Sequence, residues 1–174
     1  MKGVILVALR DLVREEFGEE LWESAVHRAG LSTGPVLLAT SDVEDETALR
    51  LFRSVGEAAS LSFRELARRF GAFWMRDFAP RVYAAYHRRC HSVRDVLEQV
   101  DRIHQDVTER IPRARPPRFE ITWRDERTAV VEYRSERGLM DLAMGLVEGA
   151  GEAFGENVDV RRAGSGRFLV YLKG

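Results

Sequence analysis

The chain has 174 residues, which fits one domain of ordinary size, and 45% of them are hydrophobic, enough for a sizeable core. The net charge is -1, so no basic excess points to nucleic acid or an anionic membrane as the main partner. Cys90 is the only cysteine, which excludes an internal disulfide, disfavours a cysteine-based zinc site and fits a reducing cytoplasm. No stretch approaches the roughly 20 apolar residues that span a bilayer, so we predict a cytoplasmic protein without membrane insertion.

The first part of the chain is predicted to be helical. Apolar residues recur at helical spacing over residues 5–17, and Gly18 is expected to end that helix. A second helix is predicted around residues 21–26. The acidic run 42–46 suits the N-terminus of a third helix, which residues 49–55 continue.

A capping-box pattern opens the next predicted helix. Ser62 and Glu65 stand three residues apart, as the reciprocal hydrogen bonds of that motif require. The apolar residues that follow carry the helix through Phe78, and Pro80 is expected to end it.

The helix predicted after Ser92 carries one apolar stripe and a histidine. Its apolar residues lie three and four apart, on one face expected toward the core: Val93, Val96, Leu97, Val100, Ile103, Val107 and Ile111. His104 falls on the same face. A buried neutral imidazole is a good metal ligand, and heme iron is often held by one axial histidine. A lone histidine on an apolar face is nevertheless more often a hydrogen-bonded core residue.

The last third is predicted to be strand-rich. Residues 119–123 and 128–133 alternate as two strands joined by a tight turn, residues 139–154 return to helical spacing, and residues 158–172 form a closing hairpin. We therefore predict a single domain over residues 1–174 with an α+β fold. It comprises an N-terminal helical subdomain followed by a C-terminal antiparallel sheet with one inserted helix.

A polar triplet follows the second of these strands. Tyr133, Ser135 and Arg137 alternate, so their side chains share one face if the strand continues through them. Two hydroxyls and a forked guanidinium suit a pair of carboxylates. The alternative is a solvated face of an edge strand. Pro117, thirteen residues after His104, is rigid enough to press on a flat ligand, although prolines commonly follow helices.

Together these features resemble the heme nitric oxide/oxygen-binding (H-NOX) family, which includes the sensor domain of soluble guanylate cyclase. The shared features are Met1-Lys2-Gly3, Ile5, Phe17-Gly18, His104, the stretch 111–117, and Tyr133-x-Ser135-x-Arg137. The resemblance implies heme b (iron protoporphyrin IX), held between the helical part and the sheet. His104 would be the iron ligand, Tyr133, Ser135 and Arg137 would hold the propionates, and Pro117 and Ile5 would press on the porphyrin from opposite sides.

The resemblance also bears on the choice of gas. Members that bind dioxygen stably carry a distal tyrosine at the position that matches Leu142 here. The other distal candidates are nearly all apolar: Leu9, Trp74, Phe78 and Leu146. We therefore predict binding of nitric oxide and carbon monoxide without a stable dioxygen complex. Trp74 has an indole N–H that can donate a hydrogen bond, but we interpret it as a residue that fills space.

The resemblance implies a sensor rather than an enzyme. Nitric oxide would weaken the iron–His104 bond, and a partner would read the changed surface in trans. Stand-alone bacterial members suggest a histidine kinase, a cyclic-di-GMP enzyme or a chemotaxis component. One alternative is a heme peroxidase or nitric oxide dioxygenase, which the lack of distal acid–base residues disfavours. Another is a heme-free adaptor or a module for a different ligand.

Four further features are expected to be ordinary. His27 and His87 are interpreted as common helix residues, and the adjacent Cys90 and His91 as surface or packing residues. The Gly-x-Gly at residues 149–151 follows a helical pattern rather than a strand, so it lacks the context of a nucleotide-binding loop.

Overall fold

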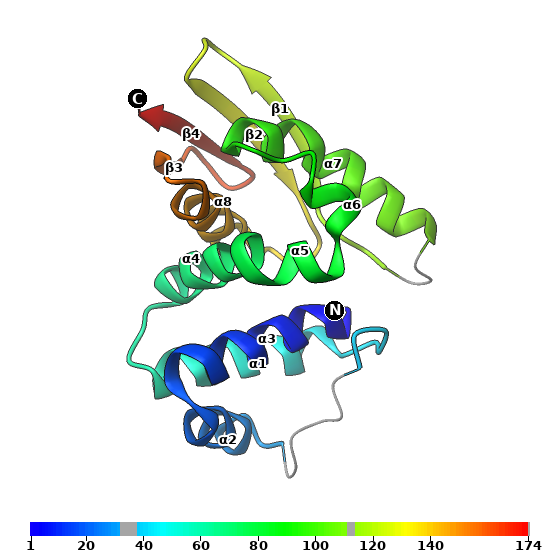
Figure 1. The fold of residues 1–174 in the computed structure, drawn as a ribbon, viewed down its shortest axis with the longest axis vertical. Coiled ribbons are helices and arrows are strands. Elements are labelled where there is room, and N and C mark those ends of the chain that lie inside the picture. The colour runs from blue at the N-terminus through cyan, green and yellow to red at the C-terminus, as the bar shows by residue number, and fades with distance from the viewer. Residues whose placement is uncertain (32–37, 111–113, 174) are drawn as a thin grey trace. The chain divides into compact units, whose positions relative to one another are not determined.

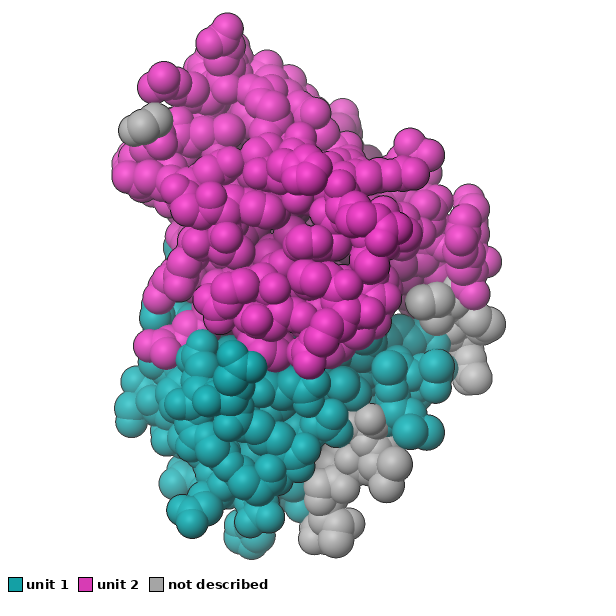
Figure 2. Space-filling model, viewed as in Figure 1, with its two compact units in different colours: residues 1–66 teal, residues 67–174 magenta. Residues whose placement is uncertain are grey.

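The computed structural model describes residues 1–31, 38–110 and 114–173. The chain divides into two compact units, residues 1–66 and residues 67–174 (Figure 2). Within the described ranges, no helix combines the length and the apolar character that crossing a bilayer requires. Ile111 of the predicted apolar stripe, and the start of the 111–117 stretch, lie outside the described residues.

The first unit is built from helices α1 (Gly3–Phe17), α2 (Glu19–Arg28) and α3 (Asp45–Ala58). These confirm the three helices predicted there. Gly18 ends α1 as expected: its φ of 87° is a left-handed value that glycine adopts without steric cost, and its N–H donates to the Arg14 carbonyl at 3.2 Å. Large buried side chains fill this unit, among them Leu12, Trp22 and Phe52.

The helix that Ser62 opens does not end where the sequence predicted. The backbone N–H of Glu65 donates to the Ser62 hydroxyl at 3.2 Å, which confirms the cap. The helical path continues past Pro80, however, in four segments: α4 (Phe63–Phe73), a π-helical turn η1 (Trp74–Phe78), α5 (Ala79–Val82) and α6 (Ala84–His87). Pro80 lies in the first turn of α5, where a missing N–H is tolerated. The turn before the proline is widened to a π-turn, and the helix does not end there.

The second unit contains the sheet. Its strands are β1 (Arg118–Trp123), β2 (Thr128–Arg134), β3 (Asn157–Arg162) and β4 (Arg167–Lys173), ordered β1-β2-β4-β3 and antiparallel throughout. Helix α8 (Met140–Phe154) is inserted between β2 and β3 in the sequence, and α7 (Val93–Arg110) precedes β1 (Figure 1). This arrangement confirms the predicted fold class.

Helices α7 and α8 supply the core that packs on the sheet. Val93 and Leu97 of α7 are buried together with Met144 of α8 and Phe168 of β4. The rest of the α7 stripe differs from the prediction, because Val100, Ile103, His104 and Val107 are only half-buried. The stripe therefore divides into an N-terminal half that belongs to the core and a C-terminal half that surrounds His104.

Three glycines bring α4 and α8 into direct backbone contact. A Cβ added at Gly145 would lie 2.4 Å from the Ala67 side chain, and one at Gly149 would lie 2.2 Å from the Arg68 carbonyl oxygen. On the opposite helix, a Cβ at Gly71 would lie 2.7 Å from the Leu146 Cα. The Gly-x-Gly at residues 149–151 thus serves helix packing and helps to place α4, and η1 after it, against α8.

Candidate functional site

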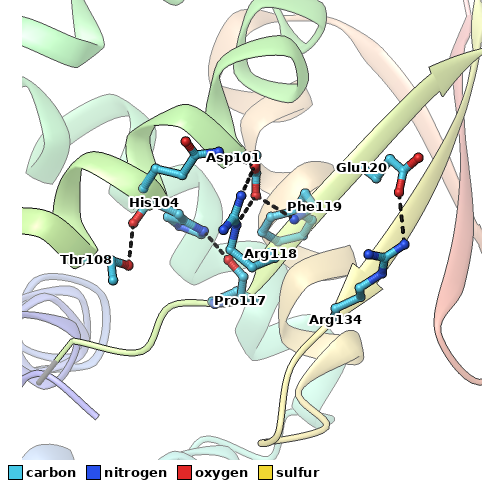
Figure 3. A network of polar contacts seen from close by, with 9 residues as sticks. Asp101, His104, Thr108, Pro117, Arg118, Phe119, Glu120 and Arg134 are labelled. Carbon is cyan, nitrogen blue, oxygen red and sulfur yellow. Dashed lines mark hydrogen bonds and ion pairs between the residues drawn. The ribbon is translucent and has the colours of Figure 1, made fainter.

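The imidazole of His104 is held by a backbone carbonyl. Its Nδ1 lies 2.8 Å from the carbonyl oxygen of Pro117, thirteen residues later (Figure 3). A carbonyl can only accept, so Nδ1 carries the proton and Nε2 of the neutral ring keeps its lone pair. Among the residues that the structure describes, Nε2 has no hydrogen-bond partner. This tautomer allows the ring to bind a metal through Nε2.

The electrostatic surroundings favour the neutral ring. Burial lowers the pKa of His104 below its ordinary value of 6.5, and the positive charge of Arg118 acts in the same direction. The hydrogen bond to the Pro117 carbonyl and the charge of Asp101 act the other way without offsetting the burial. His104 is therefore predominantly neutral at pH 7, with its Nε2 lone pair available.

An ion pair ties α7 to the residue that follows this carbonyl. Asp101 accepts Nε and Nη2 of Arg118, each at 2.7 Å, and the backbone N–H of Phe119 at 2.9 Å (Figure 3). Gln105 adds a fourth bond to the same carboxylate at 2.9 Å. The Arg118 guanidinium holds the pKa of Asp101 far below its ordinary value of 3.8. Because Asp101 lies on α7 one turn before His104, this pair ties the helix to the beginning of β1.

Phe119 connects His104 to the polar triplet. The Phe119 ring lies 5.5 Å, centroid to centroid, from the imidazole of His104 and 5.5 Å from the ring of Tyr133. Phe119 and Tyr133 are paired directly across the β1–β2 ladder. The histidine and the first residue of the triplet therefore lie on one face of the sheet, with one ring between them.

The triplet is brought together by a turn and not by a strand. β2 ends at Arg134, so the strand does not continue through Ser135 and Arg137, which was the condition for the three side chains to share one face of a strand. The backbone N–H of Arg137 donates to the Ser135 hydroxyl at 3.2 Å, and this local bond competes with strand pairing. The guanidinium of Arg137 donates to the carbonyl of Arg115, in the segment before β1. The turn thus directs Arg137 back toward the segment that holds Pro117.

Tyr133 is buried and remains a hydroxyl at neutral pH. Burial raises its pKa above 10.0, although the Ser135 hydroxyl, the Leu139 backbone and the Arg137 charge act in the opposite direction. Tyr133, Ser135 and Arg137 are thus mutually close and present two hydroxyls beside one cation. This is a donor set suited to carboxylates.

The distal candidates belong to three elements. Trp74 and Phe78 lie on η1, where the Trp74 ring is 5.0 Å from the Phe78 ring, and Leu142 and Leu146 lie one turn apart on α8. Phe78 and Leu142 are buried, whereas Trp74 and Leu146 are half-buried. The remaining candidates are on α1 in the first unit, half-buried Ile5 and buried Leu9, and their roles stay predictions.

Sequence reasoning missed four residues of this region. The Asp101–Arg118 pair joins residues seventeen apart, a spacing that no local pattern indicates. Tyr83 stacks on Trp74 with centroids 5.8 Å apart, and burial raises its pKa, so its hydroxyl is retained. His87 is not an ordinary helix residue, because its Nε2 lies 2.9 Å from the Met75 carbonyl oxygen. In this region only the apolar face of α7 that carries His104 had a recognisable sequence pattern, through its helical spacing.

The residues present fit a heme group. His104 offers a neutral nitrogen lone pair, and the Phe119 ring lies 5.5 Å from the imidazole. The neighbouring apolar residues of the α7 stripe are half-buried: Val100, Ile103 and Val107. Tyr133, Ser135 and Arg137 offer donors for two carboxylates beyond Phe119. One basic nitrogen in an apolar surround, with carboxylate-binding groups at one side, matches the chemistry of an iron porphyrin that bears two propionates.

Comparisons with known proteins agree with this donor set. A family model described as Haem-NO-binding matches residues 2–162. The soluble guanylate cyclase gcy-35 of Caenorhabditis elegans is 23% identical over 151 residues, which are 84% of this chain and 22% of that protein. The chain thus spans less than a quarter of the length of this relative.

Solved structures share the fold. The H-NOX protein from S. oneidensis in the Fe(II)NO ligation state matches with a TM-score of 0.84 over 100% of both chains, at 18% identity. An oxygen-binding H-NOX domain related to soluble guanylate cyclases, in its oxygen complex, matches with a TM-score of 0.80 over 100% of this chain and 96% of that one, at 22% identity. At these identities the likeness shows the fold alone.

Proposed function

This chain belongs to the Haem-NO-binding family, a family of heme-binding gas-sensor domains, and on that premise we propose that it senses nitric oxide and carbon monoxide with His104 as the iron ligand. One observation carries the proposal: His104 Nδ1–H donates a hydrogen bond to the Pro117 carbonyl at 2.8 Å, which leaves the lone pair of Nε2 available to bind iron. When bound, heme b would supply an iron atom that takes up a diatomic gas.

The other residues of the set receive positioning roles. Tyr133 and Ser135 would donate hydrogen bonds from their hydroxyls to the propionates, and the Arg137 guanidinium would neutralise the propionate charge. Pro117 has two roles: its carbonyl orients the imidazole, and its rigid ring would press on the flat group. The hydrogen bond that Nδ1–H donates to the Pro117 carbonyl also raises the basicity of Nε2, as outer-shell partners of ligating histidines do.

The first experiment is absorption spectroscopy of the reduced, heme-loaded protein without oxygen, before and after nitric oxide. We expect a histidine-ligated ferrous spectrum that shifts with nitric oxide. His104→Gly should lose the proximal-ligand signature and regain it when imidazole is added. His91→Gly is the matched control, because His91 is an exposed histidine just before α7, and it should behave as wild type. A chain that takes up no heme, or a spectrum indifferent to His104→Gly, would contradict the proposal.

The apolar character of the distal candidates supports the proposed choice of gas. Bound dioxygen becomes partly anionic and needs a hydrogen-bond donor, which Leu142 does not offer, while nitric oxide and carbon monoxide need it far less. We expect the ferrous protein to oxidise slowly in air without a stable oxygen complex. Leu142→Tyr should create one, whereas Leu142→Phe, which has the same ring without the hydroxyl, should not. A stable oxygen complex in the wild type that disappears in Trp74→Phe would show that the indole N–H is the donor.

We also propose that the output acts through a partner protein in trans, a histidine kinase, a cyclic-di-GMP enzyme or a chemotaxis component. Membership of the family supports a sensor that signals to a partner domain. The class of partner protein named here is an additional proposal. The test is to add the heme-loaded chain to a candidate partner from the same cell and to measure its activity. We expect the activity to differ between the unliganded and the nitric oxide states. Equal activity for every candidate would contradict signalling in trans.

A further inference from the structure

The π-helical turn η1 leaves one backbone carbonyl without a helical partner. The N–H of Ala79 donates to the Trp74 carbonyl, five residues back, as a π-turn requires. The carbonyl of Met75 would next accept from residue 80, which is a proline without an N–H. Met75 therefore has no backbone donor within the helix, and a carbonyl in that position needs another partner.

His87 supplies that partner. Its Nε2 lies 2.9 Å from the Met75 carbonyl oxygen and donates to it, because the carbonyl can only accept. The imidazole is half-buried. An N–H group from a residue twelve positions later thus replaces the donor that Pro80 lacks. This accounts for a histidine that the sequence pattern assigned no role.

The segment around the same short helix also contacts the ring of Trp74. Tyr83 is the N-cap residue of α6 and His87 is its last residue, one turn later, and the backbone N–H of His87 donates to the Tyr83 carbonyl at 3.0 Å. The Tyr83 ring stacks on Trp74 at 5.8 Å, with the planes 28° apart, while His87 bonds the carbonyl of the next residue, Met75. Two consecutive residues of η1 are therefore contacted by the N-cap residue of α6 and by its last residue.

The position of α6 is fixed in turn by the helix that carries His104. The Tyr86 hydroxyl donates to the carboxylate of Asp106 on α7 at 3.2 Å. On the other side, the Met75 side chain packs against the core beneath the sheet. A rotation of the Trp74 ring would break its stack on Tyr83, and the His87–Met75 bond ties the backbone next to Trp74 to the same segment of the chain.

We propose that His87 is a positioning residue for Trp74, and that through Trp74 it controls the rate at which carbon monoxide reaches the distal side. The second half of this inference rests on the proposed function, in which Trp74 lines that side. π-helical turns occur frequently at functional sites. Side chains donate to two carbonyls of this turn, Arg81 Nε to Asp77 at 2.8 Å and His87 Nε2 to Met75 at 2.9 Å. The His87 bond is the one made to the residue next to Trp74, so its removal should release the indole.

The test joins a probe of Trp74 to a measurement of gas binding. The full chain is labelled with 5-fluorotryptophan, and the resonance of Trp74, one of three tryptophans, is assigned by its loss in Trp74→Phe. ¹⁹F spectra are recorded with and without heme. His87→Leu should shift and broaden the Trp74 resonance. His87→Gln, whose amide N–H can still reach the carbonyl, should restore it, and the exposed-histidine control His91→Leu should leave it unchanged.

Carbon monoxide association is then followed after flash photolysis. We expect His87→Leu to change the association rate several-fold in the wild-type background and to have little effect when Trp74 is already phenylalanine. A Trp74 resonance that His87→Leu does not move would overturn the positioning role. A moved resonance with unchanged association would overturn the control of gas entry. Failure of the wild type to bind heme would overturn the proposed function, and the ¹⁹F comparison on the heme-free chain would still decide the role of His87.

Discussion

The carboxylate of Asp101 and the guanidinium of Arg118 meet at two points, with both nitrogen–oxygen distances at 2.7 Å. The pair joins α7 to the first residue of β1. The carbonyl of Pro117, the residue before Arg118, accepts the hydrogen bond that His104 donates from Nδ1. The orientation of the imidazole therefore depends on an ion pair that does not touch it.

Removing the charge of Asp101 should loosen this arrangement. Asp101→Asn keeps the shape but weakens the bonds to Arg118 and the Phe119 N–H, so we expect the free energy of unfolding to fall by about 1–3 kcal/mol. In the heme-loaded ferrous protein, the iron–histidine stretching band in the resonance Raman spectrum should broaden and move. The control is Glu98→Gln, which removes the exposed pair that Glu98 forms with Arg94 on the same helix; the expected cost is below about 0.5 kcal/mol. Equal effects of the two variants would contradict a special role for Asp101.

The same pair should give the stability a characteristic dependence on acid. The pKa of Asp101 is far below its ordinary value of 3.8, so the unfolded chain binds this proton more readily than the folded chain. Its contribution is therefore present in full above the ordinary value and decreases as the pH falls below it. The measurement is urea unfolding of wild type and Asp101→Asn across this range. The difference in free energy should be constant down to about pH 5 and should shrink below it. A difference that grows in acid would have the wrong sign.

The glycine contact between α4 and α8 should not accept a methyl group. A Cβ at Gly149 would lie 2.2 Å from the Arg68 carbonyl oxygen, and one at Gly145 would lie 2.4 Å from the Ala67 side chain. We expect Gly149→Ala and Gly145→Ala each to lower the free energy of unfolding by about 1–3 kcal/mol, the usual cost of overpacking. Gly166→Ala is the control, because its Cβ would make an ordinary contact of 3.4 Å. Thermal unfolding of the three variants decides the question, and a Gly149→Ala variant as stable as Gly166→Ala would contradict the close packing.

Two neighbouring arginines should differ in their effect on heme retention. Arg137 lies in the turn beside Ser135, whereas Arg134 is exposed and pairs with Glu120 at 2.9 Å. Loss of charge-assisted bonds worth about 1.5–3 kcal/mol should accelerate heme loss from Arg137→Ala about tenfold or more. Arg134→Ala should release heme at the wild-type rate. Transfer of heme to an excess of apomyoglobin measures both rates. Equal rates for the two variants would contradict the proposed role of Arg137 in binding the propionates.

Much of the fold and part of the site could be predicted from the sequence. The placement of His104 on α7 followed from apolar spacing, and the ββαββ order followed from alternation, since both periodicities are local properties of the chain. The turn at Ser135 was missed because a hydroxyl that accepts the N–H of Arg137 competes with strand pairing. Alternation alone does not reveal this competition.

Pro80 shows a different failure. A proline inside a helical pattern is expected to end the helix, because it has no N–H to donate to the carbonyl one turn earlier. The bond can, however, be replaced from elsewhere. His87 donates to the Met75 carbonyl and so supplies a partner from outside the turn as the helical path continues. Nothing in the spacing of residues 75, 80 and 87 indicates that they meet.

The pairing of Phe119 with Tyr133 across β1 and β2 has a consequence for how the chain can change in length. Phe119 and Tyr133 face the same side of the sheet, where the Phe119 ring also contacts the imidazole of His104. An insertion of one residue within β1 or β2 would turn one member to the opposite face. Residues 124–127 lie beyond the ladder and form the connection between its strands. Related chains can therefore differ in length at that connection, and such a change would leave His104, the proposed iron ligand, and Tyr133 on the same face of the sheet.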